Sequence, residues 1–344
     1  MWRERFGFAT ALALGLALTA AVVAAVFDLP LRDPDDAAGP TYVRLPAILL
    51  LAFLTDVVPR AVRRCHRLSE FGRDFVAVTR ERWPLDHVKF ALLGLGSWYL
   101  TYVAFRNLKS FVPFVNPGLM DGELDRLDHA LTFGHDPSAV LHDVLGTGVA
   151  AHVMSAIYIV WIVLVPLSLA AALVWSRNAS GGAWYVTAVA VDWVLGAATY
   201  FAVPTVGPIY ARPESFAALP VTDTSRLQAA MWADRVAVLD HPFATHAVQT
   251  IAAFASLHVG ILVTACLIAH LLRLNRWLRW GLWIFLGLTV VSTVYLGWHY
   301  LADALGGVVL GAAGAWAGAL ATGNHVRGRP VHRRQQTAVA QPIS

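Results

Sequence analysis

The sequence predicts an all-α integral membrane protein with about eight transmembrane helices. Apolar residues make up 57% of the 344 positions and charged residues only 14%, whereas a water-soluble domain is about one quarter charged. The apolar residues also gather in long runs, and a helix needs roughly 20 of them to cross a bilayer. Eight runs come close to that length: 6–27, 43–60, 88–105, 150–175, 183–204, 247–272, 278–297 and 299–321.

The first two apolar runs, and the fifth with its acidic residue Asp192, each have an unusual feature. The run 6–27 is longer than the apolar core of a usual signal peptide, so we expect an uncleaved anchor. The run 43–60 is the weakest, because Asp56 interrupts it; we expect this carboxylate to reach water or to pair with Arg60. Asp192 lies deep in the fifth run, where a carboxylate is costly, and we expect it to make a structural hydrogen bond.

The basic residues indicate an orientation. A formal net charge of +4 could suggest a nucleic-acid partner. However, no stretch of basic residues is interleaved with aromatic residues that could stack on bases, so we expect no nucleic-acid partner. Most of the 26 Lys and Arg residues lie in alternate loops, as the enrichment of basic residues in cytoplasmic loops requires. This pattern predicts a multi-pass protein of the plasma (inner) membrane with both termini cytoplasmic.

The runs divide the chain into four parts. We expect N-terminal transmembrane helices leading into the core over residues 1–105 and an outer-face amphipathic loop over residues 106–149. The core would follow over residues 150–322, and a disordered basic cytoplasmic tail over residues 323–344. Long loops inside a compact domain are usually functional or disordered.

Both long outer loops are expected to carry helical segments. In the first, Leu124, Leu127 and Leu131 fall on one helical face, which fits a helix lying in the headgroup layer. In the second, residues 205–246, we expect a short helix around Arg226–Val238. This second loop would form a lid over any site at the outer ends of the helices.

Three titratable residues lie at the ends of apolar runs. His258 begins the sixth run, and His299 and Asp303 begin the eighth. Residues four apart share a helix face, so Asp303 can hold the His299 imidazole in one tautomer while the second histidine moves a proton. In the predicted topology all three meet at the external interface. The set suits phosphoryl transfer on the periplasmic or extracellular side.

At these residues the sequence resembles the type 2 phosphatidic acid phosphatase superfamily. The third motif of that family, Ser-Arg-x5-His-x3-Asp-x3-Gly, is matched by the following residues, with Thr293 in place of the arginine: Ser292, His299, Asp303 and Gly307. The extra helices before a six-helix core and the His299-Tyr300 pair resemble the inositol-phosphorylceramide synthase branch, whose members are inositolphosphotransferases.

The two other motifs of the family are incomplete. Ser256 and His258 match Pro-Ser-x-His without its proline, and Arg212-Pro213 matches the end of Lys-x6-Arg-Pro, with Thr205 in place of the lysine. The resemblance therefore covers the predicted core, from about residue 150 to residue 320.

The resemblance implies a mechanism without a metal or another cofactor. His299 would attack phosphorus and form a phosphohistidine, and Asp303 would orient its ring. His258 would protonate the leaving alkoxide and then activate the incoming water or alcohol. Ser256 and Ser292 would supply hydroxyl groups to the phosphate.

Two of the three cations usual in the family are missing, although fixed donors must neutralise the developing phosphoryl charge. Arg212 is the first candidate replacement, because a planar guanidinium can bind two oxygens. Arg106 and Lys109 come next, although they could equally reach lipid headgroups from the end of the third run. Arg226 or Arg235 from the second outer loop follow.

We therefore expect an enzyme that acts on a lipid phosphate or phospholipid at the outer membrane face. It would transfer the phosphoryl group to water, or transfer a polyol (inositol) phosphate headgroup with a polyol as a possible partner. Three other interpretations stay open: a non-catalytic lipid-binding or lipid-translocating protein, an iron site built from two histidines and a carboxylate, and polar residues that only pair between helices.

Overall fold

The computed structural model describes residues 2–35, 41–326 and 329–330, and within them the regular secondary structure is almost entirely helical. Seven helices are long and apolar enough to span a membrane: α1 (Trp2–Val26), α2 (Thr41–Arg64), α4 (Leu85–Val115), α7 (Val149–Ala170, continued by a π-helical turn, Ala171–Trp175), α8 (Ala179–Ala202), α12 (Arg276–Tyr295) and α13 (Leu301–Ala321). The shorter apolar helix α11 (Leu257–Leu271) is the eighth. The predicted fold class is confirmed.

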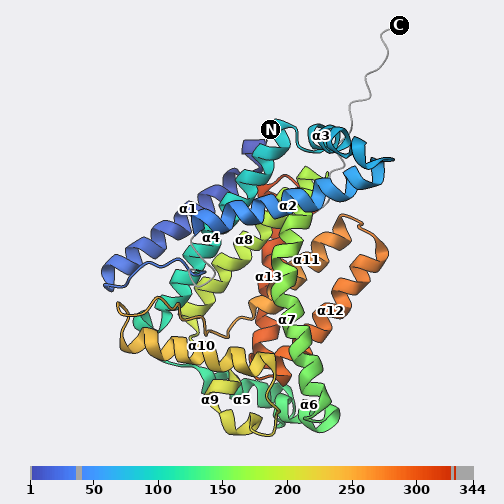
Figure 1. Ribbon diagram of the computed structural model, residues 1–344. Helices are drawn as coiled ribbons and strands as arrows, with labels where there is room; N and C mark the ends of the chain where they lie inside the picture. Colours follow the sequence, from blue (N-terminus) through green and yellow to red (C-terminus); the bar gives the residue numbers. More distant parts are fainter. Residues whose placement is uncertain (1, 36–40, 327–328, 331–344) are drawn as a thin grey trace.

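Short helices cap the two ends of the bundle (Figure 1). One end carries α5 (Asp121–Leu131), α6 (Pro137–Leu145), α9 (Pro208–Ala211) and α10 (Asp223–Asp240). The other end carries α3 (Phe71–Arg82) and the N-terminus. The remaining elements are single turns and one short hairpin: η2 (Leu68–Glu70), η4 (Pro213–Phe216), β1 (His325–Val326) and β2 (Arg329–Pro330).

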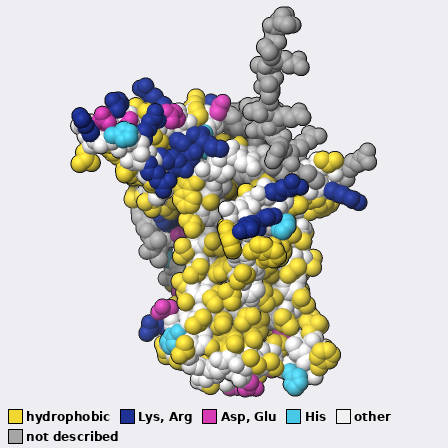
Figure 2. Space-filling model, turned by 90° about the vertical axis from the view of Figure 1, so that its right-hand side faces the viewer, with side chains coloured by type: hydrophobic (Ala, Val, Ile, Leu, Met, Phe, Trp, Pro, Cys, Tyr) yellow, Lys and Arg dark blue, Asp and Glu magenta, His cyan; other side chains and the backbone are white. Residues whose placement is uncertain are grey.

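Basic side chains gather at the α3 end. Figure 2 shows them on one side of a broad hydrophobic band, and few basic side chains lie on the other side of that band in this view. Arg63 and Arg64 end α2, and Arg80 and Arg82 end α3. The first turns of α11 and α13 lie at the opposite end, which we call the site end. Most of the predicted tail, residues 327–328 and 331–344, lies outside the described residues.

The sixth apolar run is helical only in its second half. The structure leaves residues 247–256 without helix, and α11 begins at Leu257. Several backbone N–H groups of this segment bond to side chains instead: Ile251 to Gln249, Phe254 to Thr205, and Ala255 to Thr199. Since these bonds replace the helical ones, the apolar composition of residues 247–256 does not produce a helix.

The third run forms a longer helix than predicted. α4 continues to Val115, so Arg106 and Lys109 lie on a transmembrane helix and not in the outer loop that was predicted to begin at residue 106. Residues 106–112 continue the helix because most of them are apolar or small and are buried in the bundle.

Both intramembrane carboxylates have partners. Thr264 donates to Asp192 at 2.7 Å, so the prediction of a structural hydrogen bond is confirmed. Asp56 is fully buried and pairs with both Arg60 and Arg82. It does not reach water, because α3 returns along the end of α2 and brings Arg82 to it.

Glycines allow α13 to approach its neighbours closely. A Cβ at Gly307 or Gly311 would clash with the backbone of α11, and one at Gly314 would clash with the Asp192 side chain on α8. Small residues at helix interfaces permit such close packing in membranes. α13 is thereby held between α11 and α8, and its first turn has a fixed position at the site end.

We predict that Gly311→Leu lowers the free energy of unfolding by about 1–3 kcal/mol, because overpacking forces helices apart. Thermal unfolding in detergent measures this. The matched control is Gly287→Leu on α12, where nothing lies within 4 Å of the added Cβ. Equal melting temperatures for the two variants would contradict the close packing of α13 on α11.

Candidate active site

The two histidines and the aspartate form one hydrogen-bonded chain. Nδ1 of His258 lies 2.9 Å from Nε2 of His299, and Nδ1 of His299 lies 3.2 Å from Oδ2 of Asp303. His299 is 4% exposed and Asp303 is fully buried. The structure thus brings together residues that are 41 positions apart in the chain.

Local structure fixes each ring. Ser256 is the N-cap of α11 and accepts from the backbone N–H of Val259, so His258 lies in the first turn of that helix. Positive φ at Gly297 turns the chain after α12, which places His299 just before α13. Asp303 accepts from the Tyr300 N–H at 2.9 Å as well as bonding to His299. One carboxylate therefore caps the helix and orients the imidazole.

Helix α5 supports this arrangement with two further carboxylates. Asp128 accepts from the backbone N–H groups of Leu301 and Ala302 at 2.7 and 2.8 Å. Burial raises the pKa of Asp128 to about 6, although these two bonds oppose the shift. Asp121 accepts from the backbone N–H of Gly207 at 2.9 Å and from the Tyr300 hydroxyl at 3.1 Å. α5 thus connects the start of α13 to the loop after α8.

The sequence interpretation assigned no role to these carboxylates. Asp121, Asp125 and Asp128 are four and three residues apart and so share a helix face. This acidic spacing was the available signal. The predicted leucine face is only partly buried: Leu124 is covered, while Leu127 and Leu131 are 46% and 41% exposed.

Aromatic side chains from α7 form one wall of the site. The Trp161 ring lies 4.2 Å from the His258 ring, centre to centre, and its Nε1–H donates to the His258 carbonyl at 3.0 Å. Tyr158 lies 5.1 Å from the same imidazole and stacks on Trp298. These rings exclude water from one side of the histidine pair. The sequence interpretation did not identify them.

The candidate phosphate-binding cations differ in their partners. Arg212 pairs with Asp125 at 3.2 Å and with Asp136. Arg106 donates to the Tyr102 hydroxyl, which in turn donates to Asp35. Each of these arginines therefore belongs to a network that includes a carboxylate, and their roles in phosphate binding stay predictions.

Lys109 differs from both arginines. Its ammonium lies 4.7 Å from the centre of the Tyr200 ring, and among the described residues it has no carboxylate partner. Its charge lies close enough to His258 to act on it electrostatically. Of Arg106, Lys109 and Arg212, Lys109 is therefore the cation that has no carboxylate partner among the described residues.

The predicted hydroxyl groups already have partners. Ser292 is fully buried and donates to the Met154 carbonyl at 2.8 Å. Ser256 caps α11. Thr205 occupies the lysine position of the first motif and holds the 253–254 backbone. In the part of the chain that the structure describes, no three His, Cys, Asp or Glu side chains are grouped to hold a metal ion.

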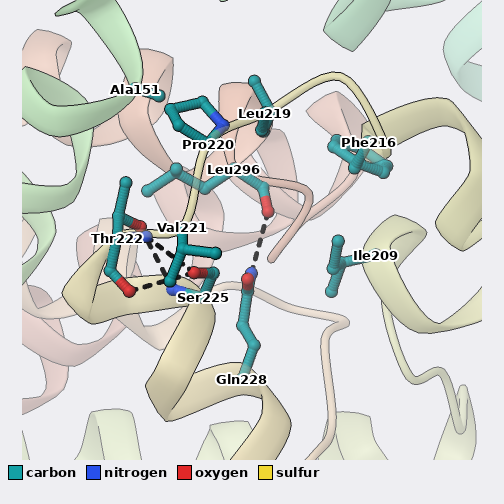
Figure 3. Close-up of a pocket in the computed structure, with 10 residues that line it drawn as sticks. All are labelled: Ala151, Ile209, Phe216, Leu219, Pro220, Val221, Thr222, Ser225, Gln228 and Leu296. Atoms are coloured by element: carbon teal, nitrogen blue, oxygen red, sulfur yellow. Dashed lines mark hydrogen bonds between the residues drawn. The ribbon is translucent and has the colours of Figure 1, made fainter. Parts of the chain in front are cut away.

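Two cavities border the helices of the site, and the larger extends from Trp161 toward the far end of α11. The small one, of about 120 Å³, is lined by the 216–228 segment, Ala151, Ile209 and Leu296 (Figure 3). Its polar side chains bond to the protein: Gln228 to the Leu296 carbonyl, and Thr222 and Ser225 to each other. The larger, apolar cavity, of about 330 Å³, lies between α7, α8, α11 and α12, and Trp161 lines it.

Comparison with known proteins identifies the family. A family model described as the PAP2 superfamily, the type 2 phosphatidic acid phosphatases, matches residues 122–317. No curated protein and no solved structure matches the chain. The matched region runs from α5 to near the end of α13 and contains both histidines and Asp303. Because it covers more than half of the sequence, the chain belongs to the PAP2 superfamily.

Proposed function

We propose that this membrane protein is a phosphotransferase or phosphatase that acts on lipid phosphate esters through a phosphohistidine on His299. Membership of the PAP2 superfamily supports a phosphatase-type enzyme with a lipid phosphate substrate. The observation that carries the proposal is the hydrogen-bonded chain from His258 through His299 to Asp303.

The hydrogen-bonded chain is consistent with one distribution of protons. With Nδ1–H of His299 donating to Asp303, Nε2 of His299 keeps its lone pair and accepts from Nδ1–H of His258. For the chemical step His258 takes up a second proton as the phosphate binds, so that it is an imidazolium. Nε2 of His299 then attacks phosphorus, the bond to the leaving oxygen breaks, and His258 gives one proton to that oxygen and becomes neutral. In the second half, His258 takes a proton from water or an alcohol, whose oxygen displaces His299 from phosphorus. Asp303 stabilises the charged ring throughout.

The substrate must separate the two rings. Nε2 and Nδ1 are 2.9 Å apart, which leaves no space for a phosphorus atom between them. Lys109 is our first choice for the cation that holds the phosphate during this step, because no carboxylate of the described residues pairs with it. Oxygens of the phosphoryl group would replace the contact that each histidine loses.

The larger apolar cavity supports a lipid substrate. Its lining runs along α11 from Ile261, one residue after the first turn, to Leu272, and along α7 from Trp161 to Trp175. Trp161 contacts His258 as well. A hydrocarbon chain in this cavity would extend from the phosphate at His299 into the bundle.

For the acceptor, the resemblance to the inositolphosphotransferase branch supports transfer of a polyol phosphate headgroup. Hydrolysis to free phosphate is the second candidate. It is favoured by the cavity in Figure 3, where Thr222, Ser225 and Gln228 are already bonded to the protein and offer few free groups to a polyol.

The distribution of basic residues supports an orientation. Arginines gather at the α3 end, and cytoplasmic segments of membrane proteins are enriched in Lys and Arg. We therefore propose that the site end faces the periplasm or the cell exterior, that both termini are cytoplasmic, and that the protein lies in the plasma membrane.

We predict that His299→Ala lowers turnover about 10³-fold or more, because the nucleophile is lost. The assay uses a panel of lipid phosphates and phosphoinositides with a chelator, with and without inositol, and follows free phosphate and new lipid. The matched control is His152→Ala, an exposed histidine on α7.

The reaction products distinguish the candidate functions. Phosphate release indicates a phosphatase, and a new lipid that forms only with inositol indicates a transferase. Lipid binding without turnover, unchanged in His299→Ala, would replace the enzyme by a lipid-binding protein.

We predict that Arg212→Gln mainly destabilises the fold, by about 1–3 kcal/mol, because it leaves Asp125 and Asp136 without their cation. Burial alone would raise the pKa of Asp136, but hydrogen bonds from Arg212 and Ser138 lower it to about 2. A lowered pKa in the folded state stabilises the protein above about pH 4, and this contribution is lost as the pH falls toward 2.

Unfolding measured at neutral pH tests the loss of stability, and unfolding measured from about pH 4 to pH 2 tests the contribution of Asp136. In Arg212→Gln the acid-sensitive contribution should shrink. Arg126→Gln, an exposed partner of Glu123 on α5, is the control. A variant that unfolds like the wild type but no longer binds phosphate would instead make Arg212 a substrate ligand.

We predict that Ala265→Phe, which places a ring in the larger cavity, raises KM for a long-chain lipid phosphate about tenfold or more. Turnover of a short water-soluble phosphate ester should stay unchanged, because the histidines do not contact Ala265. Ala312→Phe, on the exposed face of α13, is the control. Equal losses with both substrates would exclude the cavity as the site of the lipid chain.

A further inference from the structure

Arg235 on α10 is a buried cation without a partner. It is 8% exposed, and among the described residues it makes no ion pair, no hydrogen bond and no contact with an aromatic ring. Its nitrogen atoms are not among the completely buried unpaired ones, so the guanidinium keeps an accessible edge. Arg82 and Arg212 are 13% and 20% exposed, and each pairs with a carboxylate. An uncompensated buried charge is unfavourable, so the position of Arg235 needs a cause.

Arg235 lies on the face of α10 that packs against the core. Arg235 shares the buried face of α10 with Thr224, Gln228 and Val238. Gln228 donates to the Leu296 carbonyl at 2.8 Å, three residues before His299. Arg235 lies seven residues further along α10, two turns away on the same face.

Asp121 is the carboxylate that acts on Arg235. Burial lowers the pKa of the Arg235 guanidinium, and the charge of Asp121 opposes this shift. No ion pair forms, however, because Asp121 already accepts from the backbone of Val206 and Gly207 and from the Tyr300 hydroxyl. Asp121 thus acts on Arg235 without pairing with it, and the same carboxylate bonds to Tyr300, the residue next to His299. Among the described residues, the donors of Arg235 are unused.

We propose that Arg235 binds the phosphate group of the substrate as the second cation of the site, supplied by the lid helix α10. This inference rests on the proposed function. A guanidinium can bind two phosphate oxygens at once, and with Lys109 from α4 it would replace the two cations that the family motifs lack here. Both come from helices outside the motifs that carry the histidines and Asp303.

A phosphate ligand would also connect the lid to the chemistry. α10 contacts the core through Thr224, which bonds to Ser155 on α7, and through Gln228. A phosphate bound between Arg235 and His299 adds a third contact near the end of the helix. Binding of the substrate should therefore stabilise the position of α10.

The test compares Arg235→Gln and Arg235→Lys with Arg226→Gln in the full-length protein in detergent. Arg226 is on the same helix but is 72% exposed and pairs with Asp223. Inorganic phosphate and orthovanadate are the probes. Their affinities are measured by thermal shift and by inhibition of turnover, together with kcat and KM for the lipid phosphate that the wild type turns over.

We expect Arg235→Gln to bind both anions at least about tenfold more weakly and to raise KM by a similar factor, with partial recovery in Arg235→Lys. Without ligand its melting temperature should equal or exceed that of the wild type, because an uncompensated charge has been removed. Arg226→Gln should behave like the wild type.

Several results would overturn the inference. One is wild-type anion affinity in Arg235→Gln, and another is a lowered melting temperature with unchanged affinity, which would make Arg235 structural. A wild-type protein that binds neither anion would also overturn the inference. If the wild type binds both anions through Arg235 but turns over no lipid phosphate, the proposed function fails and the anion site remains.

Discussion

The start of α13 is the constraint on which the rest of the site depends. A helix leaves its first N–H groups without partners, and here two carboxylates accept from them. Asp303 accepts from Tyr300, and Asp128 from Leu301 and Ala302. Because Asp303 also bonds to His299, the same carboxylate caps α13 and orients the proposed nucleophile. Close packing of Gly307 and Gly311 on α11 then sets the distance to His258.

Acid–base groups and charges come from different parts of the fold. The two histidines and Asp303 lie on α11 and at the start of α13, the core helices that carry the family motifs. The carboxylates that support them lie on α5. Lys109 and Arg235, which have no carboxylate partner among the residues that the structure describes, lie on α4 and α10. The core can therefore keep its reacting groups while outer helices change how the phosphate is held.

The sequence predicts the fold class and the grouping of His258, His299 and Asp303 because both depend on local information. Apolar runs of about 20 residues are sufficient for spans, and His299 and Asp303 share a helix face through their spacing. What it does not predict depends on contacts between distant segments. Residues 247–256 are apolar but not helical, because Thr199, Thr205 and Gln249 bond to their backbone. Arg226 and Arg235 look equivalent in sequence, and only the packing of α10 exposes one and buries the other.

The substrate-free site is satisfied at the histidines and unsatisfied at the cations. Nδ1 of His258 and Nε2 of His299 bond to each other, so the nucleophile is not left as an unpaired buried nitrogen, which would be costly. Among the described residues, Lys109 and Arg235 have no carboxylate partner. In the proposed mechanism, entry of a phosphate would break one neutral hydrogen bond and supply an anion to these two cations, and hydrogen bonds to charged groups are the stronger ones. The exchange would favour the anion, and it would release Nε2 of His299 only when a phosphate is present to react with it.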